Sequence, residues 1–205
     1  MKRAVFYSLV LVLISGCSLQ TKVAANTQYR VEVASQSQNY SSTSCKNDLL
    51  QLKNINSYDP ITDRSIYYQI GDLKLASYSE SNWESAPFKT VELSLVSGIR
   101  DSKLFKDVIS SRSTAKPDFI LEYSVEEFIQ HFSEDMKSSY STVRIHFALL
   151  ESKNSKLLYS TTIEKKVPSS SLNALGAVKA LQSALNDLLQ QTNVWLNERC
   201  QKEFE

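Results

Sequence analysis

The sequence predicts an α+β fold of the α/β-sandwich type, in which helices pack against one mostly antiparallel sheet of about five to seven strands. Most of the chain after residue 28 alternates between apolar and polar residues in short runs, which is the period of a strand. In two segments, about 85–99 and about 171–198, the apolar residues recur instead at every third or fourth position, which is the period of a helix.

The strands expected in the first half are short and are separated by polar turns. They are predicted at 29–33, 49–55, 65–70 and 73–78. Gly71-Asp72 between the last two is typical of a hairpin turn, and the Ser-, Gln- and Asn-rich stretch 34–47 predicts a loop. The mid-chain helix should have Ser85 as its cap and Pro87 in its first turn.

The second half predicts an antiparallel meander followed by a long helix. Strands are expected at 104–109, 119–132, 143–150 and 157–167, and the last three form the meander. The alternation slips near Glu126-Glu127, which predicts a β-bulge. The closing helix, capped within Ser169 to Ser171, has about seven turns and is long enough to cross a whole sheet.

The first residues have the pattern of a secretion leader. Lys2 and Arg3 precede an apolar run at 4–14 that is too short to span a membrane. The run ends in Ile14-Ser15-Gly16-Cys17, which resembles a bacterial lipobox, and an ordinary signal peptide with an incidental cysteine is the alternative. The expected division is a signal peptide at 1–16, a lipidated tether at 17–27 and a single domain at 28–205.

Lipidation of Cys17 would place the protein in a Gram-negative cell envelope. A triacylated cysteine, with palmitate among its chains, gives the several acyl chains that stable anchoring requires. Ser18 follows the cysteine where an Asp tends to retain a lipoprotein in the inner membrane. We therefore expect the periplasmic face of the outer membrane.

The composition disfavours several classes of function. With 42% apolar and 22% charged residues, the chain is close to the globular average. Loss of Lys2 and Arg3 with the leader changes the formal net charge from +1 to −1, which disfavours nucleic-acid binding. The four glycines are not spaced for a phosphate-binding or dinucleotide-binding loop.

The sequence shows no clear catalytic or metal-binding constellation. His131 and His146 are expected on neighbouring strands, with His131 opposite about residue 142 and so not opposite His146. Glu126 and Glu127 are adjacent on a strand and should point to opposite faces. We therefore expect no enzymatic activity, no cofactor and no metal site.

Cys45 and Cys200 remain once Cys17 is assigned to lipid. Pairs of cysteines are usually bridged in the oxidising compartment of an exported protein. A bridge between these two would constrain most of the unfolded chain and would add about 2–4 kcal/mol to stability. Two free thiols on mobile segments are the alternative.

Three stretches are similar to a known family. They are DRSIYYQIGDLKLASYSESNWESAP at 63–87, PDFILEYSVEEF at 117–128 and NALGAVKALQSALNDLLQQTNVWL at 173–196. In order and spacing they resemble the auxiliary lipoproteins of ABC-type transport systems of the MCE (mammalian cell entry) kind, to which the Pqi lipoprotein belongs. The resemblance covers about 45–198 and depends on the order of the elements, because no single motif in it is specific.

This resemblance implies a lipid-anchored accessory that is not an enzyme. Its partners would be an MCE-domain protein, a permease and an ATPase, which together move phospholipids or other hydrophobic molecules between membranes. A homo-oligomer that shares the symmetry of an MCE ring would fit this role. The expected docking surface is an exposed aromatic set, Tyr67, Tyr68, Tyr78 and Trp83. Packing of half of the set in the core is the alternative.

A second hypothesis belongs to another class of function. The chain could be a structural or regulatory outer-membrane lipoprotein, for example an activator of peptidoglycan synthesis or an assembly partner of an outer-membrane protein. Neighbouring genes for a permease, an ATPase and an MCE-domain protein would favour transport over this alternative.

Overall fold

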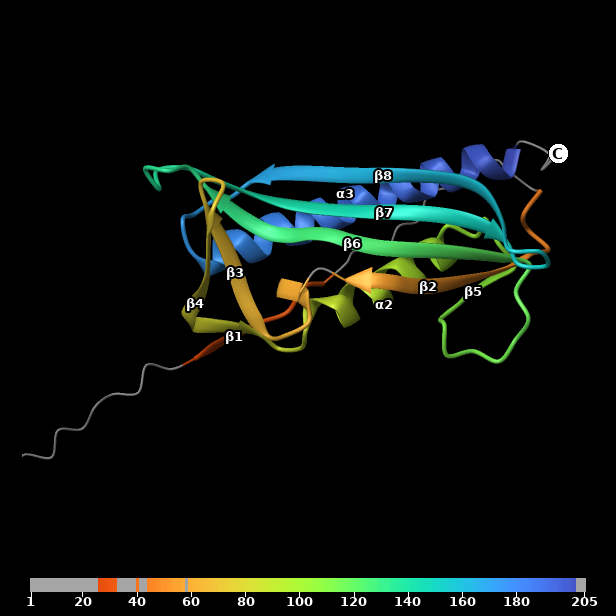
Figure 1. Cartoon of the computed structure of the whole chain (residues 1–205), viewed down its shortest axis with the longest axis horizontal. Coiled ribbons are helices and arrows are strands. Elements are labelled where there is room, and N and C mark those ends of the chain that lie inside the picture. The colour runs from red at the N-terminus through yellow and green to blue at the C-terminus, as the bar shows by residue number, and fades with distance from the viewer. Residues whose placement is uncertain (1–25, 33–39, 41–43, 58, 202–205) are drawn as a thin grey trace, which may run out of the picture.

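The computed structural model describes residues 26–32, 40, 44–57 and 59–201. The predicted signal peptide, Cys17 and most of the predicted tether lie outside the described residues. Within these residues eight strands form one sheet and two α-helices are present. Figure 1 shows two layers, with both helices against one face of the sheet. The predicted α+β sandwich is confirmed, with eight strands in place of the expected five to seven.

The longest strand, β6 (Phe119–Phe132), organises the sheet. One of its edges pairs antiparallel with β7 (Ser139–Glu151), and β7 pairs antiparallel with β8 (Lys156–Pro168). The other edge is divided between two partners. Its first half pairs parallel with β2 (Leu49–Ser57), and its last residues pair parallel with β3 (Ser65–Ile70). The sheet is therefore mixed and not mostly antiparallel as predicted, although the predicted antiparallel meander forms its longest pairings.

Three further strands complete the sheet. β4 (Lys74–Trp83) folds back antiparallel on β3 through the predicted turn, where Gly71 has a φ of 55° that suits glycine. β1 (Thr27–Tyr29) pairs parallel with the end of β4, and β5 (Asp107–Ile109) pairs parallel with β2. The strand predicted at 29–33 is misplaced, because β1 overlaps it only at Tyr29, and β5 is shorter than the strand predicted at 104–109.

The predicted bulge in β6 lies where its partner changes. The register with β7 shifts between Val125 and Glu127. This point separates the stretch of β6 that pairs with β2 from the stretch that pairs with β3. A bulge bends a strand and increases its twist. Figure 1 shows the consequence, because β3 and β4 run at a steep angle to β2.

The helices begin slightly later than predicted. α2 (Pro87–Asp101) has Pro87 in its first turn, but its cap position is Ala86, and Ser85 does not cap it. α3 (Ala174–Gln201) is capped by Asn173, whose Oδ1 accepts a hydrogen bond from the Gly176 amide at 3.0 Å. The predicted cap within Ser169 to Ser171 is therefore wrong. A short 3-10 turn, η1 (Asp59–Ile61), follows β2.

The core lies between the helices and one face of the sheet. Apolar residues of α3 pack against β6, β7 and β8, and α2 packs against β2, β5 and α3. The helices approach closely at Gly98, where an added Cβ would lie 3.4 Å from a methyl group of Leu189. The Asn193 side-chain amide donates to the Gly98 carbonyl at 3.1 Å and so fixes this crossing.

Candidate functional site

The structure brings together two of the four aromatic residues proposed for docking. Tyr68 of β3 and Tyr78 of β4 have ring centroids 4.8 Å apart, and Tyr68 also contacts Phe132 of β6 at 5.5 Å. Tyr68 is paired with Ala76, two residues before Tyr78, so strand alternation directs both tyrosines to the same face. Tyr68 and Tyr78 are half-buried. We call Tyr68, Tyr78 and Phe132 the aromatic cluster.

A buried glutamine holds this cluster in place. The Tyr78 hydroxyl donates to Oε1 of Gln130 at 2.6 Å. The side-chain nitrogen of Gln130 donates to Oγ of Ser139 at 2.9 Å and to Oγ of Ser169 at 3.2 Å. Burial, and then the neighbouring Tyr68, raises the pKa of Tyr78, so its hydroxyl stays protonated and remains a donor. The polar atoms are therefore used inside the protein, and the ring surfaces are what a partner could contact.

Tyr67 lies on the opposite face of the sheet from the aromatic cluster. It follows directly before Tyr68 in β3, and successive side chains of a strand point to opposite faces. Its hydroxyl donates to Oδ2 of Asp63 at 2.8 Å. This hydrogen bond is the main reason why the pKa of Tyr67 is raised.

Trp83 is not part of an exposed surface, so its assignment to the docking surface is wrong. Its side chain is only 4% exposed and lies 6.0 Å from the ring of Phe128. The backbone around it is fixed on both sides, because β1 pairs with this end of β4 and the Trp83 amide donates to the Arg64 carbonyl at 2.7 Å. Of the expected set of four, Trp83 is therefore buried, Tyr67 is half-buried on the other face of the sheet, and only Tyr68 and Tyr78 lie together.

A charged cluster occupies the face of the sheet that the helices leave open. Arg144 of β7 contacts Glu126 at 3.2 Å, Glu127 at 3.0 Å and Glu164 of β8 at 3.0 Å. The expectation that Glu126 and Glu127 point to opposite faces is wrong, because the bulge interrupts the alternation at this point. The hydrogen bond from His131 is the largest cause that lowers the pKa of Glu127. Each carboxylate here thus has a cationic or polar partner, and the cluster is a structural ion network.

The two histidines are separate, as predicted. His131 pairs across the meander with Tyr140 and stacks on its ring at 4.9 Å, whereas His146 pairs with Ser124 and contacts the Thr162 hydroxyl at 2.9 Å. The partner of His131 is thus Tyr140, not residue 142, because the turn is centred about one residue earlier than expected. Among the residues that the structure describes, no group of three or more His, Cys, Asp or Glu side chains is placed to hold a metal ion.

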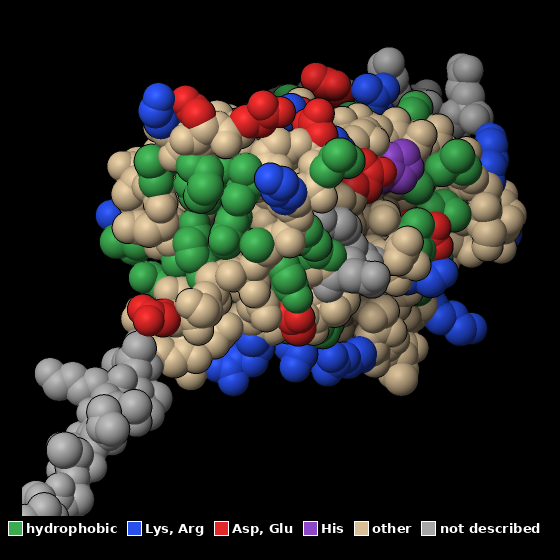
Figure 2. All heavy atoms as spheres, turned by 60° about the vertical axis from the view of Figure 1, so that its left-hand side comes forward, with side chains coloured by type: hydrophobic (Ala, Val, Ile, Leu, Met, Phe, Trp, Pro, Cys, Tyr) green, Lys and Arg blue, Asp and Glu red, His purple; other side chains and the backbone are tan. Residues whose placement is uncertain are grey.

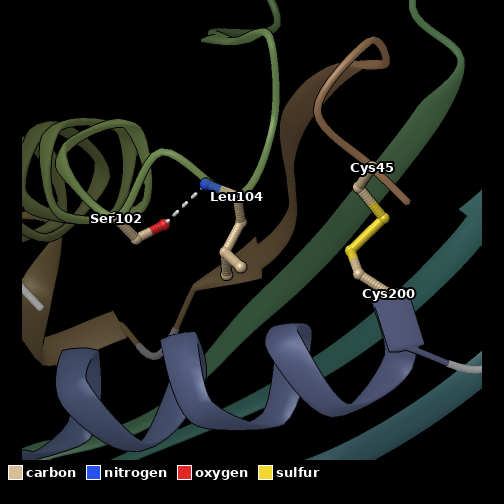
Figure 3. The surroundings of a disulfide bond; sticks show 4 residues. All are labelled: Cys45, Ser102, Leu104 and Cys200. Atoms are coloured by element: carbon tan, nitrogen blue, oxygen red, sulfur yellow. Dashed lines mark hydrogen bonds between the residues drawn. A yellow bond between two sulfur atoms is a disulfide. The ribbon is translucent and has the colours of Figure 1, made fainter. Parts of the chain in front are cut away.

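A disulfide joins Cys45, in the turn before β2, to Cys200 at the end of α3. This is the pair that the sequence favoured for a bridge. Both residues are buried, at 0% and 1% exposure. Figure 3 shows Leu104, from the segment after α2, in the same neighbourhood, and the Leu104 amide donates to the hydroxyl of Ser102. The bridge therefore ties the helical layer to the start of the sheet inside an apolar environment.

Sequence reasoning missed Gln130 and Phe132, which complete the aromatic cluster. Phe132 continues the apolar alternation of β6 and was assigned only to the strand. Gln130 stands between Phe128 and Phe132 at a position where the alternation expects an apolar residue, which is a signal that the sequence contains. The structure buries Gln130 completely, and a buried amide needs several partners. Within the described part of the chain, no helix is long and apolar enough to cross a membrane.

Solved structures with this fold exist. A protein from Xanthomonas campestris, described as belonging to family DUF330, has a TM-score of 0.73 at 21% identity, over 85% of this chain and 97% of its own. An uncharacterized protein has a TM-score of 0.62 at 13% identity, over 84% of this chain and 99% of its own. These two likenesses establish the fold alone.

Similarity to proteins described as lipoproteins is weaker. A lipoprotein from Neisseria meningitidis has a TM-score of 0.36 at 13% identity, over 71% of this chain and 99% of its own, which is too low to support an argument. No protein-family model matches the sequence, and no curated protein matches it.

Proposed function

We propose that this protein is a periplasmic accessory lipoprotein of an MCE/ABC-type lipid transport system, anchored to the outer membrane. It acts by docking to the MCE-domain component rather than by catalysis. The permease and the ATPase of the system are its indirect partners, and phospholipid is the transported class. The resemblance in order and spacing over about 45–198 supports this assignment, and the lipobox at Ile14-Ser15-Gly16-Cys17 supports the anchor.

The observation on which docking depends most is the aromatic cluster. Its tyrosines are half-buried and rigidly placed, and the Tyr78 hydroxyl is already bonded to Gln130. Aromatic residues whose orientation is preset lose little conformational freedom on binding, which is why they are enriched at protein interfaces. Such a surface can bind a protein partner through apolar contact, whereas catalysis would need reactive groups that remain free.

Docking can be tested with a photo-crosslinking phenylalanine analogue placed at position 68 or 67. The two tyrosines are neighbours in β3, are both half-buried and lie on opposite faces of the sheet. We expect irradiation of intact cells to attach the position-68 probe, and not the position-67 probe, to the MCE-domain protein. Equal cross-linking from both positions, or none from position 68, would contradict docking through the cluster.

The anchor is tested separately by Cys17→Ser. Without the thiol no lipid can be attached, so we expect the protein to move from the membrane fraction to the soluble periplasmic fraction. Cell fractionation followed by immunoblotting measures this, with Cys45→Ser as the control that leaves the lipobox intact. A Cys17→Ser protein that still sediments with membranes would disprove the anchor.

A further inference from the structure

Exposed apolar side chains gather at one end of the molecule. Among the described residues ten large hydrophobic side chains are exposed, and six of them come from this end. They are Leu73 and Leu75 of the β3–β4 hairpin, Met136 and Tyr140 at the β6–β7 turn, and Leu172 and Leu175 at the start of α3. Figure 2, with this end turned forward, shows hydrophobic side chains grouped on it. Isolated exposed leucines need no explanation, but a group of them marks a contact surface.

The two turns at this end lie side by side. The Gly71 amide of the β3–β4 turn donates to the Phe132 carbonyl of β6 at 3.2 Å, and Gly71 faces the side chain of Glu134. Leu73 is 94% exposed at the tip, and Met136 is 45% exposed in the neighbouring turn. Met136 also has a φ of 54°, a conformation that Gly or Asn adopts more easily. The turn thus presents a large apolar side chain where a small residue would fit the backbone better.

The charges around these tips are of both signs. Asp72, Glu134 and Asp135 lie among Lys74 and Lys137, and the Lys137 ammonium is 3.5 Å from the Asp135 carboxylate. This mixture has one acid in excess, so it does not form the basic patch that selects anionic lipids. It is instead compatible with zwitterionic headgroups, which present one positive and one negative charge each.

The proposed lipid anchor brings this end close to the bilayer. Nine residues separate Cys17 from Thr27, where β1 begins, and they span at most about 35 Å when fully extended. Figure 1 shows β1 on the same side of the molecule as the β3–β4 hairpin and the β6–β7 turn, whereas the β7–β8 turn lies at the opposite end. A short tether makes a weak membrane contact effectively intramolecular, so a few apolar side chains suffice to orient the domain.

We propose that the end formed by the β3–β4 and β6–β7 turns rests on a zwitterionic phospholipid surface, with Leu73 and Met136 entering the interface. The inference rests on the proposed lipid anchor and adds an orientation to it. The bridged end of the molecule then points away from the membrane.

The test uses the full-length lipidated protein reconstituted into phosphatidylcholine vesicles that contain brominated phosphatidylcholine. Bromine quenches tryptophan fluorescence only at short range. Leu73→Trp places the probe at the proposed contact. Leu157→Trp is the matched control, because Leu157 is 55% exposed and is the second residue of β8, next to the β7–β8 turn at the opposite end. The native Trp83 and Trp195 are buried and contribute equally to both variants.

We expect brominated lipid to quench the added fluorescence of Leu73→Trp at least two-fold more than that of Leu157→Trp. Replacing one third of the lipid by phosphatidylglycerol should not increase the difference, and an increase would contradict the zwitterionic assignment. Equal quenching in vesicles that still carry the protein on flotation would overturn the orientation and leave the anchor intact. Protein that does not float with the vesicles would overturn the anchor, and the orientation with it.

Discussion

Gln130 shows how one polar residue can organise a surface. It is fully buried in β6, yet its amide bonds Tyr78 of β4, Ser139 of β7 and Ser169 before α3. A buried amide without partners would be costly, and here its partners come from three separate parts of the chain. The orientation of Tyr78 is therefore determined by contacts that meet only in the folded protein.

The ionisation of Glu127 should make the stability of the protein depend on pH. Its carboxylate contacts His131 and Arg144, and these contacts lower its pKa below the usual 4.5. A carboxylate with a lowered pKa stabilises the folded state fully above its usual pKa, and this contribution is lost as pH falls through the lowered value. The free energy of unfolding should accordingly decrease as the pH falls below the usual pKa of 4.5.

We expect Glu127→Gln to flatten this acid dependence. The variant should be less stable than the wild type at pH 7, and its free energy of unfolding should fall less between pH 6 and pH 3. Urea unfolding at a series of pH values measures both quantities. Glu126→Gln is the control, because Glu126 also contacts Arg144 but is more exposed. Identical pH slopes for Glu127→Gln and the wild type would contradict the assignment.

At the scale of elements, the start of α3 is more constrained than a helix of this length requires. The chain folds over itself before the helix, so that a Cβ at Gly176 would lie 2.0 Å from the Ser171 carbonyl oxygen. No side chain can occupy that space unless Ser169 to Ser171 move. Because Ser169 also bonds Gln130, such a movement would disturb the aromatic cluster.

Substitution of two helical glycines should therefore have opposite effects. Gly176→Ala should destabilise the protein by about 1–3 kcal/mol, the usual cost of overpacking. Gly98→Ala should be neutral or stabilising by up to about 1 kcal/mol, because alanine favours helix and its Cβ would meet Leu189 at ordinary contact distance. Chemical denaturation compares the two variants. An unchanged free energy of unfolding for Gly176→Ala would show that the start of α3 relaxes freely.

At the scale of the whole molecule, the two ends have different roles. One end carries β1, the two exposed turns and the aromatic cluster. At the other end, the Cys45–Cys200 disulfide joins the last turn of α3 to the segment that leads into β2. Because it links residues 155 positions apart, the bridge restricts the unfolded chain strongly.

We expect the double substitution Cys45→Ala and Cys200→Ala to lower the free energy of unfolding by about 2–4 kcal/mol. A reductant should destabilise the wild type by a similar amount and should leave the double variant unchanged, which separates loss of the bridge from loss of packing. Peptide mapping without reduction should recover a Cys45–Cys200 peptide. Recovery of two alkylatable thiols from the untreated protein would contradict the bridge.

Most elements of this fold were predictable from local patterns. The bounds of β6, its bulge near Glu126-Glu127 and the hairpin at Gly71 all follow from period and turn chemistry, which nearby residues specify. The positions of the two helices were also predictable to within a few residues. Their cap residues were predicted wrongly, because a cap depends on where the preceding chain lies.

The pairing of the strands and the composition of the surface depended on contacts between distant segments. The alternation of β6 does not predict that β2 and β3 both pair with the same edge of this strand. Backbone hydrogen bonds between strands do not depend on side-chain identity. That division, with the bend at the bulge, places Tyr68 beside Tyr78, buries Trp83 and directs Glu126 and Glu127 to the same arginine. Local periodicity thus specifies elements, and long-range packing specifies which side chains meet.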